Sequence, residues 1–262
     1  MNSNRLFLLG GGDREMDEIR EVLVRNGEKF CDKSLSWGAK LSDYRDIIEH
    51  LYPSNLSAVE EREYYANSDL PIIYAIELTV DDPILAKNVQ IIDHHNELAA
   101  NPPSLIQVLN ILGLQPTELQ KRIGWVDAMG WRGLLLNTTM TVDEIKNFIG
   151  VNLYDPEFVD GIEHAWAFRR IWGEWSILEL PHSKTVMACN VLIGRYDKIA
   201  FICPDEIGIY DCPETAKQLQ TMFGGWSGGA GLFVPELKSS FWGLATSDPK
   251  IIQQFKNFIE TK

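Results

Sequence analysis

The chain passes from apolar to ionisable side chains within one short stretch, Asn88-Val89-Gln90-Ile91-Ile92-Asp93-His94-His95. The apolar, β-branched residues of 89–92 predict a short buried strand, and the tripeptide 93–95 follows at its carboxyl end. In open α/β sheets, ligands collect outside the carboxyl ends of the strands. An imidazole there can bind a divalent metal ion, and a neighbouring carboxylate can orient the imidazole. Two histidines that merely complete a turn are the alternative, and the position at a strand end favours a functional site.

Two further apolar runs precede this strand. Residues 5–9 predict a strand that stops at Gly10-Gly11-Gly12, and residues 13–26 then combine acidic and apolar residues at helical spacing. Residues 70–76 predict a second buried strand. Two helices are expected after the tripeptide, over Ser104–Leu112 with Ser104 as N-cap and over about Glu118–Trp125. Strands that alternate with helices imply a parallel sheet, so the expected fold class is α/β.

The pattern changes in the second half of the chain. Residues 141–171 are acidic with helical spacing, and the aromatic residues near their end are Trp166, Phe168, Trp172 and Trp175. Further on we expect strands over 176–180, 185–192 and 198–202, a helix over 214–223, a strand near Phe241 and a helix over 249–259. The sequence therefore predicts a parallel-sheet domain over residues 1–140, a helical connector over 141–171 and a smaller mixed α/β domain over 172–262.

The composition is that of a globular chain with a strong acidic excess. It is 45% hydrophobic and 23% charged, and its formal net charge is -13. Long nucleic acids are held mainly by Lys and Arg, so this charge disfavours them. A small phosphorylated ligand is easier to admit, and a divalent cation would help to bind it.

Targeting signals and cysteine spacing point to the cytoplasm. No apolar run approaches the roughly 20 residues of a membrane helix, and residues 1–5 lack the apolar region of a signal peptide. We therefore expect a cytoplasmic protein with no membrane partner. The cysteines show no metal-ribbon or redox spacing and are expected to be reduced and mostly buried: Cys31, Cys189, Cys203 and Cys212.

A second motif follows the tripeptide at Gly124-Trp125-Val126-Asp127, after a loop and the two expected helices. In this order the motifs resemble those of the DHH superfamily of phosphoesterases, and the resemblance covers nearly the whole chain. It implies a DHH-type metal-binding domain followed by a DHHA1-like substrate-binding domain. It makes His94 and Asp127 metal ligands. It also implies catalytic roles for Asp93, which would orient the histidines, and for His95, which would stabilise an oxyanion or act as a general acid.

The family also supplies an acidic ligand at the end of the strand before the tripeptide strand. Glu77, which ends the run at Tyr74-Ala75-Ile76, is the preferred match. Asp82 is the alternative, although Val80-Asp81-Asp82-Pro83 also suits a solvated turn.

The first motif departs from the family pattern of one histidine and two alternating aspartates. In Gly10-Gly11-Gly12-Asp13-Arg14-Glu15-Met16-Asp17, Asp13 and Glu15 keep the alternation as expected metal ligands, but no histidine is present. The lost imidazole weakens one of two expected metals, so the site holds one metal tightly, two loosely, or none. The glycines could instead cradle a phosphate at a helix N-terminus, although the acidic first turn would repel an unmetallated anion.

Residues 224–231 form a glycine-rich segment similar to the glycine-glycine-histidine loop of the family's substrate domain. Glycines let a backbone approach a ligand closely and point N–H groups at phosphate oxygens. The residues expected to bind substrate are Gly224, Gly225, Trp226, Ser227, Gly228 and Gly229. Trp226 and Ser227 stand where the family usually has glycine or histidine, and a hinge between helix and strand is the alternative.

Together these features predict a metal-dependent phosphoester hydrolase. The expected cofactor is manganese (Mn2+), with Mg2+ and Co2+ as alternatives, and the expected substrate is a nucleotide, a cyclic dinucleotide or a short oligonucleotide. A homodimer is left open. The competing hypothesis is a non-catalytic nucleotide-binding or regulatory protein that retains the fold. An inorganic pyrophosphatase is a weaker third option, because the phosphate clamps that it needs are not identifiable.

Overall fold

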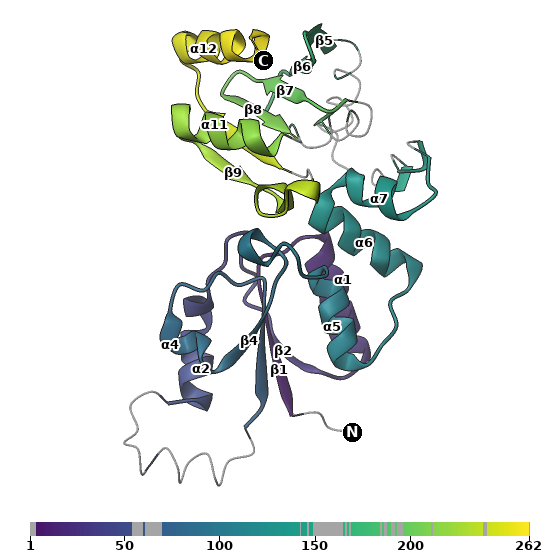
Figure 1. Cartoon of the computed structure of the whole chain (residues 1–262). Coiled ribbons are helices and arrows are strands. Elements are labelled where there is room, and N and C mark those ends of the chain that lie inside the picture. The colour runs from purple at the N-terminus through teal and green to yellow at the C-terminus, as the bar shows by residue number, and fades with distance from the viewer. Residues whose placement is uncertain are drawn as a thin grey trace. The chain divides into compact units, whose positions relative to one another are not determined.

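The computed structural model describes residues 4–53, 60, 70–141, 143–145, 147–148, 165, 167, 169–183, 185, 188–189, 192, 196–210, 212–237 and 240–261. Its internal contacts divide the chain into two compact units, drawn in Figure 1. The first consists of residues 1–94 and 101–124, and the second of residues 95–100 and 125–262. The predicted division at residues 140 and 171 stays a prediction, because most of 141–171 lies outside the described residues.

The first unit is built on a four-stranded parallel sheet, as expected from the sequence. The strand order is β2-β1-β3-β4. The strands are β1 (Arg5–Leu9), β2 (Lys29–Cys31), β3 (Ile72–Ile76) and β4 (Val89–Ile92). Central strand β1 is buried on both faces, since Phe7, Leu8 and Leu9 are inaccessible to solvent. Such continuous apolar strands are typical of parallel sheets that helices cover on both sides.

Helices cover both faces of this sheet (Figure 1). Helices α1 (Arg14–Arg25) and α5 (Ser104–Leu112) pack against each other on one face. The other face carries α2 (Arg45–Leu51) and α4 (Pro83–Ala86), and Ile48 of α2 joins the core formed by Leu8 and Ile73. Four short 3-10 helices lie in the described parts of the two units, namely η1 (Leu41–Tyr44), η2 (Asn96–Leu98), η3 (Ala230–Leu232) and η4 (Pro235–Leu237).

Tyr44 fastens the carboxyl ends of two strands to each other. Its fully buried hydroxyl donates to the Leu9 carbonyl at 2.6 Å, lies 3.2 Å from the Cys31 carbonyl and accepts the Lys33 N–H. Burial raises the pKa of Tyr44 to about 12. The phenol therefore fixes the edge of the sheet from which the next loops leave.

The second unit contains a six-stranded mixed sheet with the order β5-β6-β7-β8-β10-β9. Its strands are β5 (Arg169–Trp172), β6 (Trp175–Glu179), β7 (Ile199–Ile202), β8 (Glu206–Tyr210), β9 (Trp226–Gly228) and β10 (Phe241–Ala245). Strands β6 and β7 run parallel, and the other neighbouring pairs are antiparallel. The mixed α/β architecture expected for the second half of the chain is confirmed.

Alternate side chains along these strands point to opposite faces of the sheet and pack into two separate hydrophobic cores. Helices α11 (Pro213–Phe223) and α12 (Pro249–Glu260) pack on one face, where Trp175, Ile177 and Trp242 are buried. The opposite face buries Leu178 and Phe201. Helix α6 (Glu118–Met129) runs from the first unit into the second, and α7 (Trp131–Asn137) follows it. None of the described helices combines the length and the apolar character that crossing a bilayer would need.

Three sequence-based expectations about local structure were wrong. Within the strand expected over 185–192, the described residues Ala188 and Cys189 are helical, and the Cys189 N–H donates to the Thr185 carbonyl at 2.9 Å. A short apolar run cannot be assigned to helix or strand by periodicity alone. Arg169-Arg170, expected in a helical segment, begins β5. Ser104 is the first residue of α5, while Pro103 occupies the N-cap position and makes no side-chain capping hydrogen bond.

Candidate metal centre

The carboxyl ends of β3 and β4 lie level with each other. Ile76 pairs with Ile92 in the parallel ladder, and the Glu77 N–H donates to the Ile92 carbonyl at 2.9 Å. Glu77 and Asp93 are therefore the first residues beyond the two strands, and His94 comes one residue later. This is the edge of a parallel sheet where ligand sites form.

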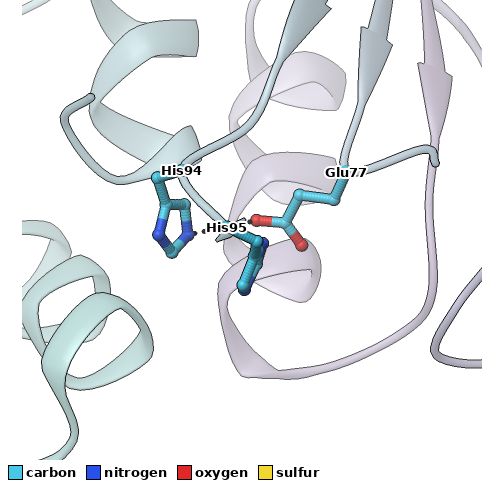
Figure 2. A group of neighbouring side chains, drawn as sticks. All are labelled: Glu77, His94 and His95. Atoms are coloured by element: carbon cyan, nitrogen blue, oxygen red, sulfur yellow. Dashed lines mark ion pairs between the residues drawn. The ribbon is translucent and has the colours of Figure 1, made fainter. Parts of the chain in front are cut away.

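Two carboxylates approach the buried imidazole of His94. Its Nε2 atom lies 3.2 Å from Glu15 Oε2 and 3.4 Å from Glu77 Oε1. The side chains of His94, Glu15 and Glu77 are 2%, 0% and 9% exposed. Their candidate ligand atoms all lie within 4.8 Å of one another. Figure 2 shows the His94 ring turned toward the Glu77 carboxylate, with His95 next in the chain.

Glu15 is held in place from three directions. It lies in the first turn of α1, and its Oε1 atom accepts the backbone N–H of Leu105 at 3.2 Å. Helix α6 comes so close that a Cβ atom on Gly124 would lie 3.3 Å from the same Oε1 atom and 2.8 Å from Cβ of Pro103. Only glycine gives Glu15 this room. The role of Gly124 could not be predicted from the sequence, although a lone glycine within a helical pattern often has a packing reason.

Glu77 adopts a backbone conformation that non-glycine residues rarely take. Its φ angle is 51°, in the left-handed region. Such strain costs on the order of 1–3 kcal/mol and collects at functional sites. The glycine turn after β1 packs closely against this backbone, because a Cβ atom on Gly10 would lie 2.6 Å from the Glu77 carbonyl oxygen. The strained backbone places the Glu77 carboxylate beside His94.

Asp93 fixes the backbone from which His94 leaves the strand. Its carboxylate accepts the His94 N–H at 2.7 Å. The Asp93 carbonyl accepts from the side-chain amides of Asn101 at 3.1 Å and Gln107 at 3.0 Å. These bonds orient the turn, and neither amide was singled out by the sequence analysis, because polar residues in a loop or at a helix start carry no distinctive signal.

The cluster has the chemistry of a divalent metal site. Two buried carboxylates lie beside one buried imidazole. Buried charges are costly unless they are paired or coordinate a metal. Carboxylate oxygen and imidazole nitrogen together suit Mn²⁺, Mg²⁺, Co²⁺ or Zn²⁺. The donor set therefore fits the kind of cofactor expected from the sequence.

The remaining predicted ligands occupy defined positions. Asp13 is the N-cap of α1 and accepts the Met16 N–H at 2.8 Å. Asp127 lies on α6, and in the second unit its Oδ2 atom is 3.9 Å from Nε2 of His95. The side chain of His95 is 40% exposed. Metal binding by Asp13 and Asp127 and catalysis by Asp93 and His95 stay predictions.

Asp82, the alternative to Glu77, has a structural role. It is the N-cap of α4, accepts the Ile84 N–H at 2.8 Å and pairs with Arg45 at 2.5 Å. The hydrogen bond from Arg45 lowers the pKa of Asp82. These contacts are those of a capped turn, and they favour Glu77 as the residue of this loop that serves the cluster.

The glycine-rich segment is partly a strand. Trp226, Ser227 and Gly228 form β9 and pair with β10. A Cβ atom on Gly225 would lie 2.2 Å from the Gly243 carbonyl oxygen, and one on Gly228 would lie 2.6 Å from the Phe241 ring. Close packing therefore explains two of the glycines without a ligand. Substrate binding by residues 224–229 stays a prediction.

The fold and this cluster define an α/β protein of two units with a candidate metal centre at the carboxyl edge of its parallel sheet. No protein-family model matches the chain, and no curated protein matches its sequence. Two solved structures resemble it along almost their whole length. One is the pGpG-specific phosphodiesterase PggH from Vibrio cholerae, with a TM-score of 0.45, 12% identity and coverage of 99% of both chains. The other is an exopolyphosphatase-related protein from Bacteroides fragilis, with a TM-score of 0.40, 11% identity and coverage of 90% of this chain and 92% of that chain.

Proposed function

We propose that this chain is a metal-dependent phosphoesterase that hydrolyses a small phosphoester. The observation that supports the proposal most directly is the buried cluster of Glu15, Glu77 and His94 beside the Asp93-His94-His95 tripeptide. Burying carboxylates at a strand end lowers the stability of the folded protein, and a bound cation would offset that loss. The proposed cation is Mn²⁺, as the resemblance to the DHH phosphoesterases implies.

Glu15, Glu77 and His94 would hold the ion, and we include Asp127 as a further ligand. Gly124 of α6 lies close to Glu15, and Asp127 is three residues further along the same helix. Residues three apart lie on the same face of a helix, and this spacing is the reason for proposing Asp127 as a ligand. Asp13, at the start of α1, is the proposed fifth ligand.

The chain's own residues would supply the rest of the chemistry. A bound divalent cation lowers the pKa of coordinated water and offsets charge on the phosphate. His95 is exposed enough to meet a substrate, and its proposed role is to donate a hydrogen bond or a proton to the departing oxygen. The Asp93 carboxylate accepts the His94 backbone N–H, and the proposed role of Asp93 is to orient the two histidines. Residues 224–229 are proposed to bind the substrate.

One observation supports the second candidate, a nucleotide-binding protein without catalysis. The family's missing histidine has no room at two of the three glycines that precede Asp13. A Cβ atom would lie 2.6 Å from the Glu77 carbonyl oxygen at Gly10 and 2.7 Å from the Ser36 carbonyl oxygen at Gly11. At Gly12, nothing lies within 4 Å. A histidine at Gly10 or Gly11 would displace neighbouring backbone, so the turn supplies no imidazole there, which favours a single metal and weaker catalysis, or none.

Metal content and turnover, measured on the same preparations, test the proposal. Protein purified without chelator is analysed for bound metals. It is then assayed with Mn²⁺ against pGpG, a cyclic dinucleotide, a nucleoside bisphosphate and pyrophosphate. We expect bound divalent metal and hydrolysis of at least one phosphodiester, with both lost in Glu77→Gln.

A matched control is Glu21→Gln, which alters an exposed carboxylate on α1 and should change neither measurement. Metal binding without turnover would favour the non-catalytic candidate. Turnover of pyrophosphate alone would favour a pyrophosphatase. Absence of both metal and turnover would overturn the proposed function.

A further inference from the structure

Trp37 is 85% exposed, more than any other large hydrophobic side chain among the described residues. It lies in the connection between β2 and η1, which leaves the same carboxyl edge of the sheet as the candidate metal centre. Single exposed hydrophobic residues are common on protein surfaces. Trp37 differs from such residues in two respects: its loop lies near the candidate metal centre, and backbone hydrogen bonds hold that loop on both sides.

The amino-terminal side of the Trp37 loop is pressed against the glycine turn after β1. The Gly12 N–H donates to the Leu35 carbonyl at 3.2 Å. A Cβ atom on Gly11 would lie 2.7 Å from both the Ser36 carbonyl oxygen and the Trp37 nitrogen. The backbone of Trp37 therefore touches the turn that leads directly into Asp13 and Glu15.

The carboxyl-terminal side of the same loop is fastened to the segment after β3. The Thr79 N–H donates to the Ala39 carbonyl, and the Leu41 N–H donates to the Thr79 carbonyl, both at 2.9 Å. Thr79 is two residues beyond Glu77. The Trp37 loop is thus bonded on one side to the turn that precedes Glu15 and on the other side to the segment that follows Glu77. Its exposure is not a consequence of a loose loop, because backbone hydrogen bonds hold both sides.

We propose that Trp37 is a stacking platform for a nucleobase, so that the substrate of the site is a base-bearing phosphoester and not a polyphosphate. This inference rests on the proposed function. An indole face stacks on any base without needing hydrogen bonds to it. Stacking is well suited to a chain with a net charge of -13, which offers little general attraction for an anionic ligand. Trp37 then selects for the base while the metal centre engages the phosphate.

Two ligands that differ only in the base test the inference. Binding of GMP and of ribose 5-phosphate is measured by calorimetry in the presence of Mn²⁺, with the full chain and with Trp37→Ala and Trp37→Phe. We expect Trp37→Ala to weaken GMP binding about 5- to 100-fold, the range for loss of one base–aromatic stack. Ribose 5-phosphate binding should not change, and Trp37→Phe should recover part of the loss.

The control is Val24→Ala. Val24 is 61% exposed and lies in the last turn of α1, at the end of that helix opposite Asp13. Its substitution should affect neither ligand. The inference is overturned if Trp37→Ala leaves GMP binding unchanged, or weakens both ligands equally. It is also overturned if the parent binds no GMP, or if gel filtration shows that Trp37→Ala dissociates a dimer.

Hydrolysis decides the proposed function separately. If the parent protein binds GMP through Trp37 but hydrolyses no phosphoester, the stacking inference is supported and the proposed hydrolase activity is refuted. If the parent protein hydrolyses a dinucleotide and Trp37→Ala has the same KM, the hydrolase activity is supported and the stacking role of Trp37 is refuted.

Discussion

Glu15→Gln should stabilise the metal-free protein and weaken its metal binding. The carboxylates of Glu15 and Glu77 have oxygen atoms within 4.8 Å of each other, and both side chains are buried. Two unit charges at that distance repel by about 3–4 kcal/mol at an effective dielectric constant of about 20. The glutamine keeps an oxygen that can accept the Leu105 N–H, so this hydrogen bond need not be lost. A protonated His94 would offset part of the repulsion, so we expect a gain of about 1–3 kcal/mol.

The assay compares unfolding with chelator and with added Mn²⁺. A metal at 100 times its Kd stabilises the folded state by about 2.7 kcal/mol. We expect the parent to show this metal-dependent gain, and Glu15→Gln to unfold at a higher denaturant concentration in chelator but to gain little from Mn²⁺. Glu21→Gln on the same helix is the control, because its carboxylate is exposed and pairs with Arg25. A Glu15→Gln protein that is destabilised in chelator, or that keeps the full metal-dependent gain, would refute the electrostatic reasoning.

His94→Ala should lower the bound metal several-fold in elemental analysis, because the variant loses one ligand. Circular dichroism should show an intact fold. Unchanged metal content would show that His94 is not a ligand. Gly12→His should raise metal stoichiometry, because a side chain at Gly12 meets nothing within 4 Å. Gly10→His should instead impair folding, since its Cβ would strike the Glu77 carbonyl oxygen at 2.6 Å, and a stable Gly10→His protein would contradict this packing. Tyr44→Phe should cost about 1–3 kcal/mol near pH 7, because the buried Leu9 carbonyl loses its donor. Burial raises the pKa of Tyr44 to about 12, so its stabilising contribution is present below about pH 10 and is lost as the pH rises toward 12. Denaturant midpoints at pH 7 and 11 should therefore fall less in Tyr44→Phe than in the parent, and a parallel fall would count against the role of the phenol.

The sequence predicted the elements of the first unit that have strong local signals. The apolar runs at 5–9, 70–76 and 88–92 correspond to β1, β3 and β4, and the helix over Ser104–Leu112 has the same bounds in the structure, whereas β2, α2 and α4 were not foreseen. The strand prediction for residues 185–192 was wrong because the periodicity of a short apolar run does not distinguish a strand from a helix. The strand Trp226–Gly228 was also not foreseen, since glycines weaken the strand signal and only packing against β10 explains them.

The candidate site was predictable in part for the same reason. Asp93-His94-His95 and Glu77 stand out because they follow buried strands directly. The contacts that assemble the cluster are long-range, and no local pattern reports them. Leu105 donates to Glu15 across 90 positions of sequence, and Gly124 makes room for the same carboxylate from a separate helix. Trp37 gave no signal either, because its exposure depends on how its loop is fastened.

The packing of the glycine turn after β1 bears on how this chain could change over evolutionary time. A histidine cannot reappear at position 10 or 11 by a single substitution, because the Glu77 and Ser36 backbones occupy the space that its Cβ would need. Both segments would have to move first, and neither movement has a benefit until the histidine is present. Of these three glycines, only Gly12 has room for a side chain, because nothing lies within 4 Å of its added Cβ atom. A second imidazole could therefore enter this turn at position 12 without displacing the neighbouring backbone.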